Sequence, residues 1–209
     1  MRSDAQEASA LPHLHVVGDS ISLRYGPDLD RMLARVARYS RKPVVGDDPE
    51  SANGRDSGTV LAYLDGLRAA GRAKIDYLMV NCGLHDVKRD LVDARPLTPL
   101  AQYAANLSAI AELARAFGAR LIWVRATPVI DAIHNNAPDM AFHRFAADVA
   151  AYNEVADAVM RKAGACIIDL HGFTQALGPD VYCDHVHFTP EVARLQAAFI
   201  AGCLSQIII

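Results

Sequence analysis

The sequence has little cysteine, and its four cysteines show none of the CxxC spacing that is typical of zinc or redox sites. Cys82 and Cys166 lie in or at the end of apolar runs, where packed, reduced thiols are the usual case. No apolar run approaches the roughly 18–20 residues that a membrane-spanning helix needs. The first residues also lack the apolar stretch of a secretory signal. We therefore predict a cytoplasmic protein with no membrane partner, although an exported form whose signal was removed stays open.

An excess of charge of either sign is also lacking. The 21 Lys and Arg residues oppose 24 Asp and Glu residues, for a formal net charge of -3. Because no basic stripe is present to neutralise phosphates, we expect no nucleic-acid partner. With only 13 Gly and 10 Pro, the chain is not collagen-like, and 52% hydrophobic residues exclude disorder. We predict one globular domain, residues 13–209, preceded by an N-terminal extension, residues 1–12.

Short apolar runs of strand length alternate with longer stretches that have apolar residues three and four positions apart. The predicted strands are residues 15–18, 75–81, 120–126 and 165–170, with a weaker strand at 43–45. The predicted helices are residues 29–39, 60–70, 99–117 and 142–162, and a last helix that begins at Thr189-Pro190-Glu191. This alternation predicts a single-domain, three-layer α/β/α fold with a flavodoxin-like parallel sheet of about five strands.

Ligands of such folds bind beyond the carboxyl ends of the strands, so the residues there are the candidates for function. Gly18-Asp19-Ser20 follows the first predicted strand and places a hydroxyl near a helix N-terminus, which favours developing negative charge. A simple helix cap is the alternative interpretation of this motif. The chain has no GxGxxG or GxxxxGK[ST] loop, so we expect no nucleotide cofactor.

Two further polar motifs also lie next to predicted strands or helices. Gly83-Leu84-His85-Asp86 follows the predicted strand at 75–81, and Asp184-His185-Val186-His187 precedes the last helix. An Asp can orient an imidazole that takes the proton from a serine, so the second motif suits acid–base work. Each motif alone is weak, but together they supply a nucleophile, a donor and an acid–base pair.

These motifs resemble those of the SGNH, or GDSL-type, hydrolases, over roughly residues 14–204. The resemblance implies that Ser20 is the nucleophile, that His187 is its general base and that Asp184 orients the imidazole. It also implies a covalent acyl-enzyme, with no cofactor and no metal.

The same resemblance implies an oxyanion hole. Its donors are the backbone N–H of Ser20, a backbone N–H at Gly54 or Arg55, and the side chain of His85. Arg55 stands where the family usually has its oxyanion glycine, and His85 stands where the family usually has an asparagine. A histidine can donate the same bond through a ring N–H, more strongly if the neighbouring Asp86 keeps it protonated.

Other residues near these motifs are candidates for binding substrate: Asp19, Tyr25 and His185, together with the loop residues 133–136. Tyr25 either shapes an acyl pocket or only packs the start of the helix. His13 and His15 have the residue type of metal ligands, but they enter the first strand at the far end of the sheet, so we expect no metal site there.

Our interpretation is a serine esterase that hydrolyses short-chain acyl esters, with a carbohydrate O-acetyl esterase as the leading hypothesis. The expected partner is a small-molecule or carbohydrate ester, and the sequence does not indicate an oligomeric state. Three alternatives stay open: a lysophospholipase or acyl-thioesterase, acyl transfer to a sugar, and a non-catalytic relative that only binds an acylated or carbohydrate ligand.

Overall fold

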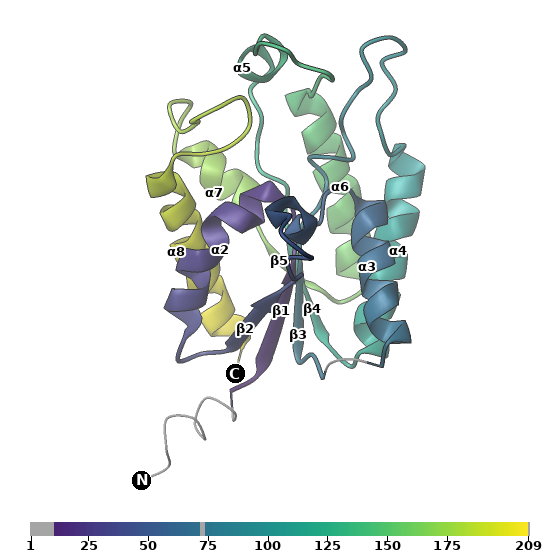
Figure 1. Ribbon diagram of the computed structural model, residues 1–209, viewed down its shortest axis with the longest axis vertical. Coiled ribbons are helices and arrows are strands. Elements are labelled where there is room, and N and C mark those ends of the chain that lie inside the picture. The colour runs from purple at the N-terminus through teal and green to yellow at the C-terminus, as the bar shows by residue number, and fades with distance from the viewer. Residues whose placement is uncertain (1–10, 72–73, 209) are drawn as a thin grey trace.

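The computed structural model describes residues 11–71 and 74–208 (Figure 1). The predicted extension, residues 1–12, thus lies outside the described residues except for its last two. The centre of the fold is a five-stranded sheet in which all neighbouring strands are parallel, in the order β2-β1-β3-β4-β5. The strands are β1 (His13–Val17), β2 (Arg38–Arg41), β3 (Tyr77–Val80), β4 (Arg120–Val124) and β5 (Cys166–Ile168).

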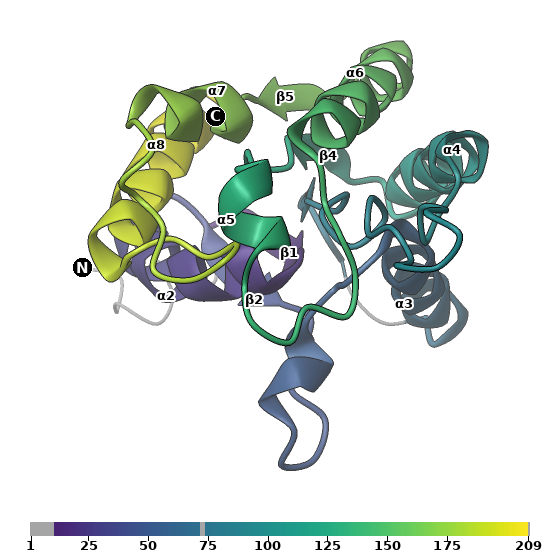
Figure 2. The ribbon, with the colours of Figure 1, turned by 90° about the horizontal axis from the view of Figure 1, so that it is seen from above.

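Helices cover both faces of the sheet, which confirms the three-layer α/β/α prediction (Figures 1 and 2). One face carries α2 (Ser20–Leu33), α7 (Leu170–Ala176) and α8 (Pro190–Ile207). The other face carries α3 (Ser57–Ala69), α4 (Leu100–Ala116) and α6 (Ala146–Lys162). Two short helices, a 3-10 turn (Pro49–Ala52) and α5 (Asp131–Asn135), lie in the loops.

The central strands are apolar on both faces because helices cover both sides of the sheet. Leu78, Val80 and Trp123 are fully buried, and Val80 pairs with Trp123 across β3 and β4. The carboxyl ends of all five strands therefore meet at one edge of the sheet, which is the upper edge in Figure 1.

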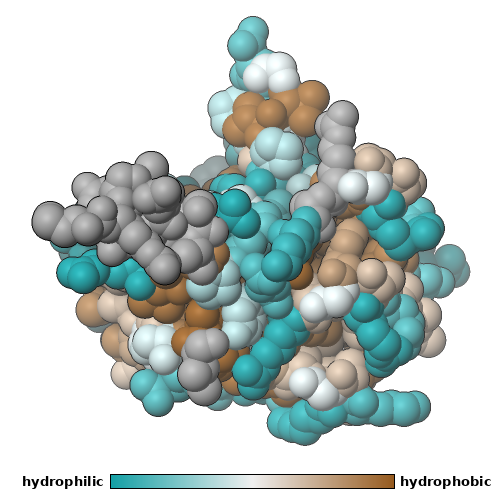
Figure 3. Space-filling view, turned by 90° about the horizontal axis from the view of Figure 1, so that it is seen from below, coloured by the Kyte–Doolittle hydropathy of each residue, from teal (hydrophilic) through white to brown (hydrophobic). Residues whose placement is uncertain are grey.

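Two of the predicted elements are wrong in position. The edge strand is not 43–45 but β2, a polar segment that pairs only with β1. Pro43-Val44-Val45 lies instead in the loop that projects from the body in Figure 2, and Figure 3 shows apolar surface along this projection. An edge strand buries little of its surface, so an apolar run is a poor guide to its position.

The predicted helix at 29–39 is also displaced, because α2 begins at Ser20 and ends at Leu33. Gly26 and Pro27 lie inside this helix, where both residues are unfavourable. They interrupt the helical spacing of apolar residues, so this spacing is clear in the sequence only after Pro27. The helix predicted at 142–162 begins later, at Ala146.

Glycine ends three of the helices, and a threonine caps the start of the last one. Gly71, Gly118 and Gly164 have φ values of +61°, +69° and +75°, the left-handed conformation in which glycine has no steric penalty. At the start of α8, the Thr189 side chain accepts a hydrogen bond from the Val192 N–H at 3.4 Å, and Pro190 occupies the first turn.

His15 should make the stability of the protein depend on pH. It is 7% exposed in the middle of β1, where its ring nitrogens contact Ser40 Oγ at 2.8 Å and Tyr63 Oη at 3.0 Å. Burial, together with the charges of His13 and Arg41, lowers its pKa to about 4. The unfolded chain, with an ordinary histidine pKa of about 6.5, then binds the proton more readily, so acidification below pH 6.5 favours unfolding.

We expect His15→Gln to be less stable than the wild type at pH 7. Glutamine does not titrate, so the difference in unfolding free energy should narrow by about 2 kcal/mol between pH 6.5 and pH 4. Urea denaturation at several pH values measures this difference. Curves that stay parallel over this range would show that His15 is not the titrating group.

Candidate active site

Ser20 is placed by the junction of β1 and α2. The chain leaves β1 at Val17 and enters the helix at Ser20, the first residue of α2. Asp19 caps this helix, because its Oδ1 accepts the Ile21 N–H at 3.0 Å. The Ser20 hydroxyl therefore stands at the positive end of a 14-residue helix dipole, above the carboxyl edge of the sheet.

His187 and Asp184 lie in the loop between α7 and α8, which local hydrogen bonds hold in shape. Asp184 Oδ1 accepts the N–H groups of Val186 and His187 at 2.8 and 2.7 Å. The next residue, Phe188, is buried against the ring of Tyr182 and anchors the loop to the core. His187 is thus fixed just before the first turn of α8.

These two segments, 167 residues apart in sequence, meet at the sheet edge. His187 Nε2 lies 2.8 Å from Ser20 Oγ, and His187 Nδ1 lies 2.7 Å from Asp184 Oδ2. These are hydrogen-bond distances for a nucleophile, its base and the group that orients the base.

Asp184 is held in its ionised form. Burial raises its pKa, but the hydrogen bonds from the N–H groups of His187 and Val186 and from the imidazole outweigh this and lower the pKa to about 2. Arg24 adds a cation 3.5 Å from Asp184 Oδ2. A permanent carboxylate at Nδ1 favours the tautomer in which Nε2 accepts the proton of Ser20.

Gly54 does not fit its predicted role as an oxyanion donor. Its N–H donates to the Gly18 carbonyl at 2.8 Å, and a Cβ at this position would lie 3.0 Å from the same oxygen. Glycine is required here because two backbone segments approach closely, and the N–H is already bonded.

The backbone N–H of Arg55 has an acceptor that an oxyanion can displace. Its N–H donates at 2.8 Å to Asn53 Oδ1, an atom of a rotatable side chain. Arg55 also has φ +55°, a left-handed conformation that glycine adopts more readily. The backbone therefore keeps a shape suited to glycine although the residue is arginine. The Ser20 N–H has no hydrogen-bond partner among the residues that the structure describes.

His85 lines the cavity that also contains Ser20 and His187. Burial, followed by the charges of Lys88 and Arg144, lowers its pKa to about 3, so the ring is neutral at neutral pH. Among the hydrogen bonds and ion pairs of the described residues, none joins the neighbouring Asp86 to the ring. It accepts the Ser57 N–H at 3.0 Å and the Ser57 hydroxyl at 2.5 Å, which ties the His85 loop to the start of α3. His85 can still donate one hydrogen bond, through whichever ring nitrogen carries its proton.

Two of the predicted substrate-binding residues are wrong. Asp19 is 1% exposed and caps α2, and Tyr25 is 0% exposed in the core under the same helix. The third, His185, does line the cavity, and its Nδ1 lies 2.9 Å from His134 Nδ1.

The loop residues 133–136 do not line the cavity either, although two of them support residues that do. His134 is fully buried behind His185. The Asn135 side chain accepts the Arg144 N–H at 2.9 Å.

The catalytic cavity, of about 340 Å³, contains residues that motif analysis missed. Lys88, Phe142 and Arg144 line one of its walls, together with Ser20, His85 and His187. Phe142 and Arg144 fall within a helix predicted from apolar spacing, and this concealed them. Lys88, three residues after His85, was the one nearby signal.

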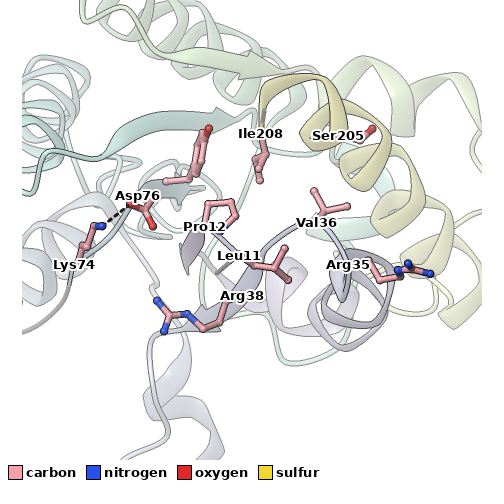
Figure 4. Close-up of a pocket in the computed structure, with 10 residues that line it drawn as sticks. Leu11, Pro12, Arg35, Val36, Arg38, Lys74, Asp76, Ser205 and Ile208 are labelled. Carbon is pink, nitrogen blue, oxygen red and sulfur yellow. Dashed lines mark ion pairs between the residues drawn. The ribbon is translucent and has the colours of Figure 1, made fainter. Parts of the chain in front are cut away.

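A second cavity, of about 750 Å³, lies at the opposite, amino end of the sheet (Figure 4). It is lined by Leu11, Pro12, Arg35, Val36, Arg38, Lys74, Asp76, Tyr77, Ser205 and Ile208. The charged pair in Figure 4, Lys74 and Asp76, is 4.0 Å apart. The lining holds no histidine and no nucleophile–base pair.

Three features bear on metal binding, membranes and thiols. Within residues 11–71 and 74–208, no three His, Cys, Asp or Glu side chains form a group that could hold a metal ion. No helix in the same ranges combines the length and apolarity needed to cross a bilayer. All four cysteines are free thiols.

Comparisons with known proteins identify a family and a fold. The model of the GDSL-like lipase/acylhydrolase family matches residues 16–195. No curated protein sequence matches the chain. Among solved structures, the chain is similar to the lipase/acylhydrolase from Enterococcus faecalis, with 16% identity, a TM-score of 0.69 and coverage of 95% of this chain and 98% of that one.

Two other solved structures have the same fold. An acetyl xylan esterase, AlAXEase, has 12% identity and a TM-score of 0.67, and the match covers 91% of this chain and 98% of that one. The psychrotrophic esterase EstA from Pseudoalteromonas sp. has 16% identity and a TM-score of 0.63, and the match covers 93% of this chain and 97% of that one.

Proposed function

Because the chain belongs to the GDSL-like lipase/acylhydrolase family and is therefore an ester hydrolase, we propose that it is a serine esterase for short acyl groups, with Ser20, His187 and Asp184 as its catalytic triad. The observation that carries the proposal is the continuous hydrogen-bonded chain from Ser20 Oγ through His187 to Asp184. Three groups that are hydrogen-bonded in this order supply a nucleophile, a base and an orienting carboxylate.

The reaction follows from this arrangement. Ser20 Oγ attacks the ester carbonyl carbon while His187 Nε2 accepts the hydroxyl proton, and Asp184 stabilises the imidazolium. The tetrahedral intermediate then collapses, and Nε2 returns the proton to the departing alcohol. Water, deprotonated by the same nitrogen, attacks the acyl-enzyme and releases the acid and free Ser20.

The negative charge on the carbonyl oxygen needs donors. We assign them to the backbone N–H of Ser20, the backbone N–H of Arg55 and the ring N–H of His85. The helix dipole of α2 adds a favourable field at the first of these. A neutral His85 is a weaker hydrogen-bond donor than a protonated one. A protonated ring would, however, place a third cation beside Lys88 and Arg144.

The substrate class is argued from the size of the cavity. A volume of about 340 Å³ is at the lower end for small-molecule sites and suits an acetyl or similarly short acyl group with part of its alcohol. Acetylated carbohydrate is the leading candidate for this alcohol. The similarity to an acetyl xylan esterase is compatible with it.

One observation favours a longer acyl chain as the second candidate. A more apolar hollow of about 610 Å³ adjoins the catalytic cavity and shares Leu23 and Glu50 with it. Its lining includes Pro27, Pro43 and Val44, on and below the projecting loop. An acyl chain that passed Leu23 into this hollow would make the protein a lipase or lysophospholipase.

Hydrolysis of p-nitrophenyl acetate, butyrate, octanoate and palmitate separates the two candidates. The proposal predicts the highest kcat/KM for acetate, with a steady fall as the chain lengthens. A matched variant, Val44→Asp, places a charge in the apolar hollow and should leave acetate hydrolysis unchanged. A maximum at octanoate or palmitate that Val44→Asp removes would replace the short-chain assignment with the long-chain one.

A further inference from the structure

Two cations lie against one aromatic ring on a wall of the catalytic cavity. Lys88 Nζ lies 4.4 Å from the centre of the Phe142 ring, and Arg144 Cζ lies 4.9 Å from it. All three side chains line the cavity that also contains Ser20 and His187. Positive charge is therefore built into the space that the substrate must enter.

Arg144 is held rigidly but is not saturated with hydrogen bonds. The residue is only 3% exposed, its Nε donates to the Leu84 carbonyl at 2.6 Å, and its backbone N–H donates to Asn135 Oδ1. Its Nη1 has no hydrogen-bond partner among the described residues. A buried guanidinium N–H without an acceptor is costly, so this donor is suited to an oxygen atom of a ligand.

No protein carboxylate neutralises the two cations directly. Neither Lys88 nor Arg144 forms an ion pair with any carboxylate of the described residues. Glu50 lines the same cavity but is exposed, and it accepts a hydrogen bond from Asn53 Nδ2. Asp184 is engaged by His187. Asp19 uses only its Oδ1 to cap α2, and its charge acts on Arg144, but the two side chains form no hydrogen bond or ion pair among the described residues.

The pKa of Lys88 is lowered by burial and by the positive potential at this wall. Burial, followed by the charges of Arg144 and Arg55, lowers the pKa of Lys88 to about 8, against the opposing effect of Asp56 and Asp19. Most Lys88 side chains are still protonated at pH 7. Two partly desolvated cations of this kind repel one another, and a bound anion would relieve the repulsion.

We propose that Lys88 and Arg144 form a subsite for an anionic oxygen group, a carboxylate or a phosphate, that the ester substrate itself carries. Lys88 Nζ and Arg144 Nη1 donate to the anion, while the Phe142 ring packs against the carbon skeleton beside it. The substrate class is then an ester that carries an acidic group, on its acyl or its alcohol side, rather than an ester of a neutral sugar. This inference rests on the proposed esterase function and narrows it.

Two pairs of matched esters test the proposal. The first pair, 4-acetoxybenzoate and its methyl ester, places the charge on the alcohol side. The second, mono-p-nitrophenyl adipate and its methyl ester, places it on the acyl side, and 4-acetoxyphenyl phosphate replaces carboxylate by phosphate. In at least one pair we expect kcat/KM to be about tenfold or more higher for the charged member, as one charge-assisted hydrogen bond implies.

The variant Lys88→Met should bring this ratio of charged to neutral ester toward one. The ratio is used because it cancels any general loss of activity or of folded protein. Lys88→Arg keeps the charge and should keep the preference, and Lys162→Met, at the exposed end of α6, is the matched control. Arg144 is not truncated, because its loss would leave the Leu84 carbonyl without its donor.

Binding to Ser20→Ala gives a readout that needs no turnover. Measured by calorimetry, 4-acetoxybenzoate and 4-acetoxyphenyl phosphate should bind this variant more tightly than the methyl ester does. Their affinity should fall as the salt concentration is raised. The proposal is overturned if charged and neutral members bind and react alike, or if Lys88→Met leaves their ratio unchanged. Failure of the esterase function is distinguishable, because then the wild type would hydrolyse none of the esters while binding is still measured.

Discussion

Ser20→Ala is expected to reduce hydrolysis of p-nitrophenyl acetate by about 10⁴-fold or more, as removal of a serine nucleophile does in other triads. His187 Nε2 would then face a methyl group, and no other hydroxyl lies within hydrogen-bond distance of that nitrogen among the described residues. The fold should be unaffected, since the cap of α2 comes from Asp19 and not from Ser20. Measured kcat/KM and the thermal midpoint together test the assignment.

Ser108→Ala is the matched control for this variant. Ser108 lies on the exposed side of α4, and its hydroxyl donates only to the Ala104 carbonyl of its own helix. It should keep wild-type activity and a similar thermal midpoint. If Ser20→Ala retained turnover while remaining folded, the nucleophile would have to be a different residue or water.

His85→Ala is expected to lower kcat by about 10²–10³-fold, the usual cost of removing one oxyanion donor. His85→Asn should retain much of the activity, because an amide N–H can donate the same bond. The prediction is specific, since the resemblance to the GDSL-type hydrolases places His85 where that family usually has an asparagine, and since the ring is neutral in the cavity. Single-turnover and steady-state kinetics with p-nitrophenyl acetate distinguish the two variants.

The pH profile offers a second check on His85. Because its pKa is lowered to about 3, His85 does not titrate where the enzyme is assayed, so neither variant should shift the profile above pH 5. Equal loss of activity in both variants would indicate a role that only an imidazole can perform. A shift in the acid limb would contradict the neutral state of His85.

Much of the site could be predicted because catalytic motifs are local in sequence. Gly18-Asp19-Ser20 and the segment from Asp184 to His187 are each a short turn beside one structural element, a strand in the first case and a helix in the second. In a parallel sheet with helical crossovers, the carboxyl ends of the strands share an edge. The sequence alone therefore predicts that Ser20 and His187 approach each other.

The errors share a different physical origin. Tyr25 was placed near the substrate from its distance along a helix, but the direction of a side chain depends on which helix face packs on the sheet. Gly54 is a candidate donor because it directly precedes Arg55, which stands at the position of the family's oxyanion glycine, yet its N–H is bonded to Gly18 by a contact between distant segments. Arg144 was concealed within a predicted helix whose first turn is really a loop.

The sequence by itself determined the parallel α/β layers, the family and the order of the candidate nucleophile, donor and acid–base pair, because periodicity and short motifs are carried by neighbouring residues. Only the tertiary structure decided which backbone N–H groups stay available to an oxyanion, that His85 is neutral, and that Lys88 and Arg144 line one cavity with Ser20. Hydrogen bonding, desolvation and local potential are sums over groups that are distant in sequence, so no local pattern records them.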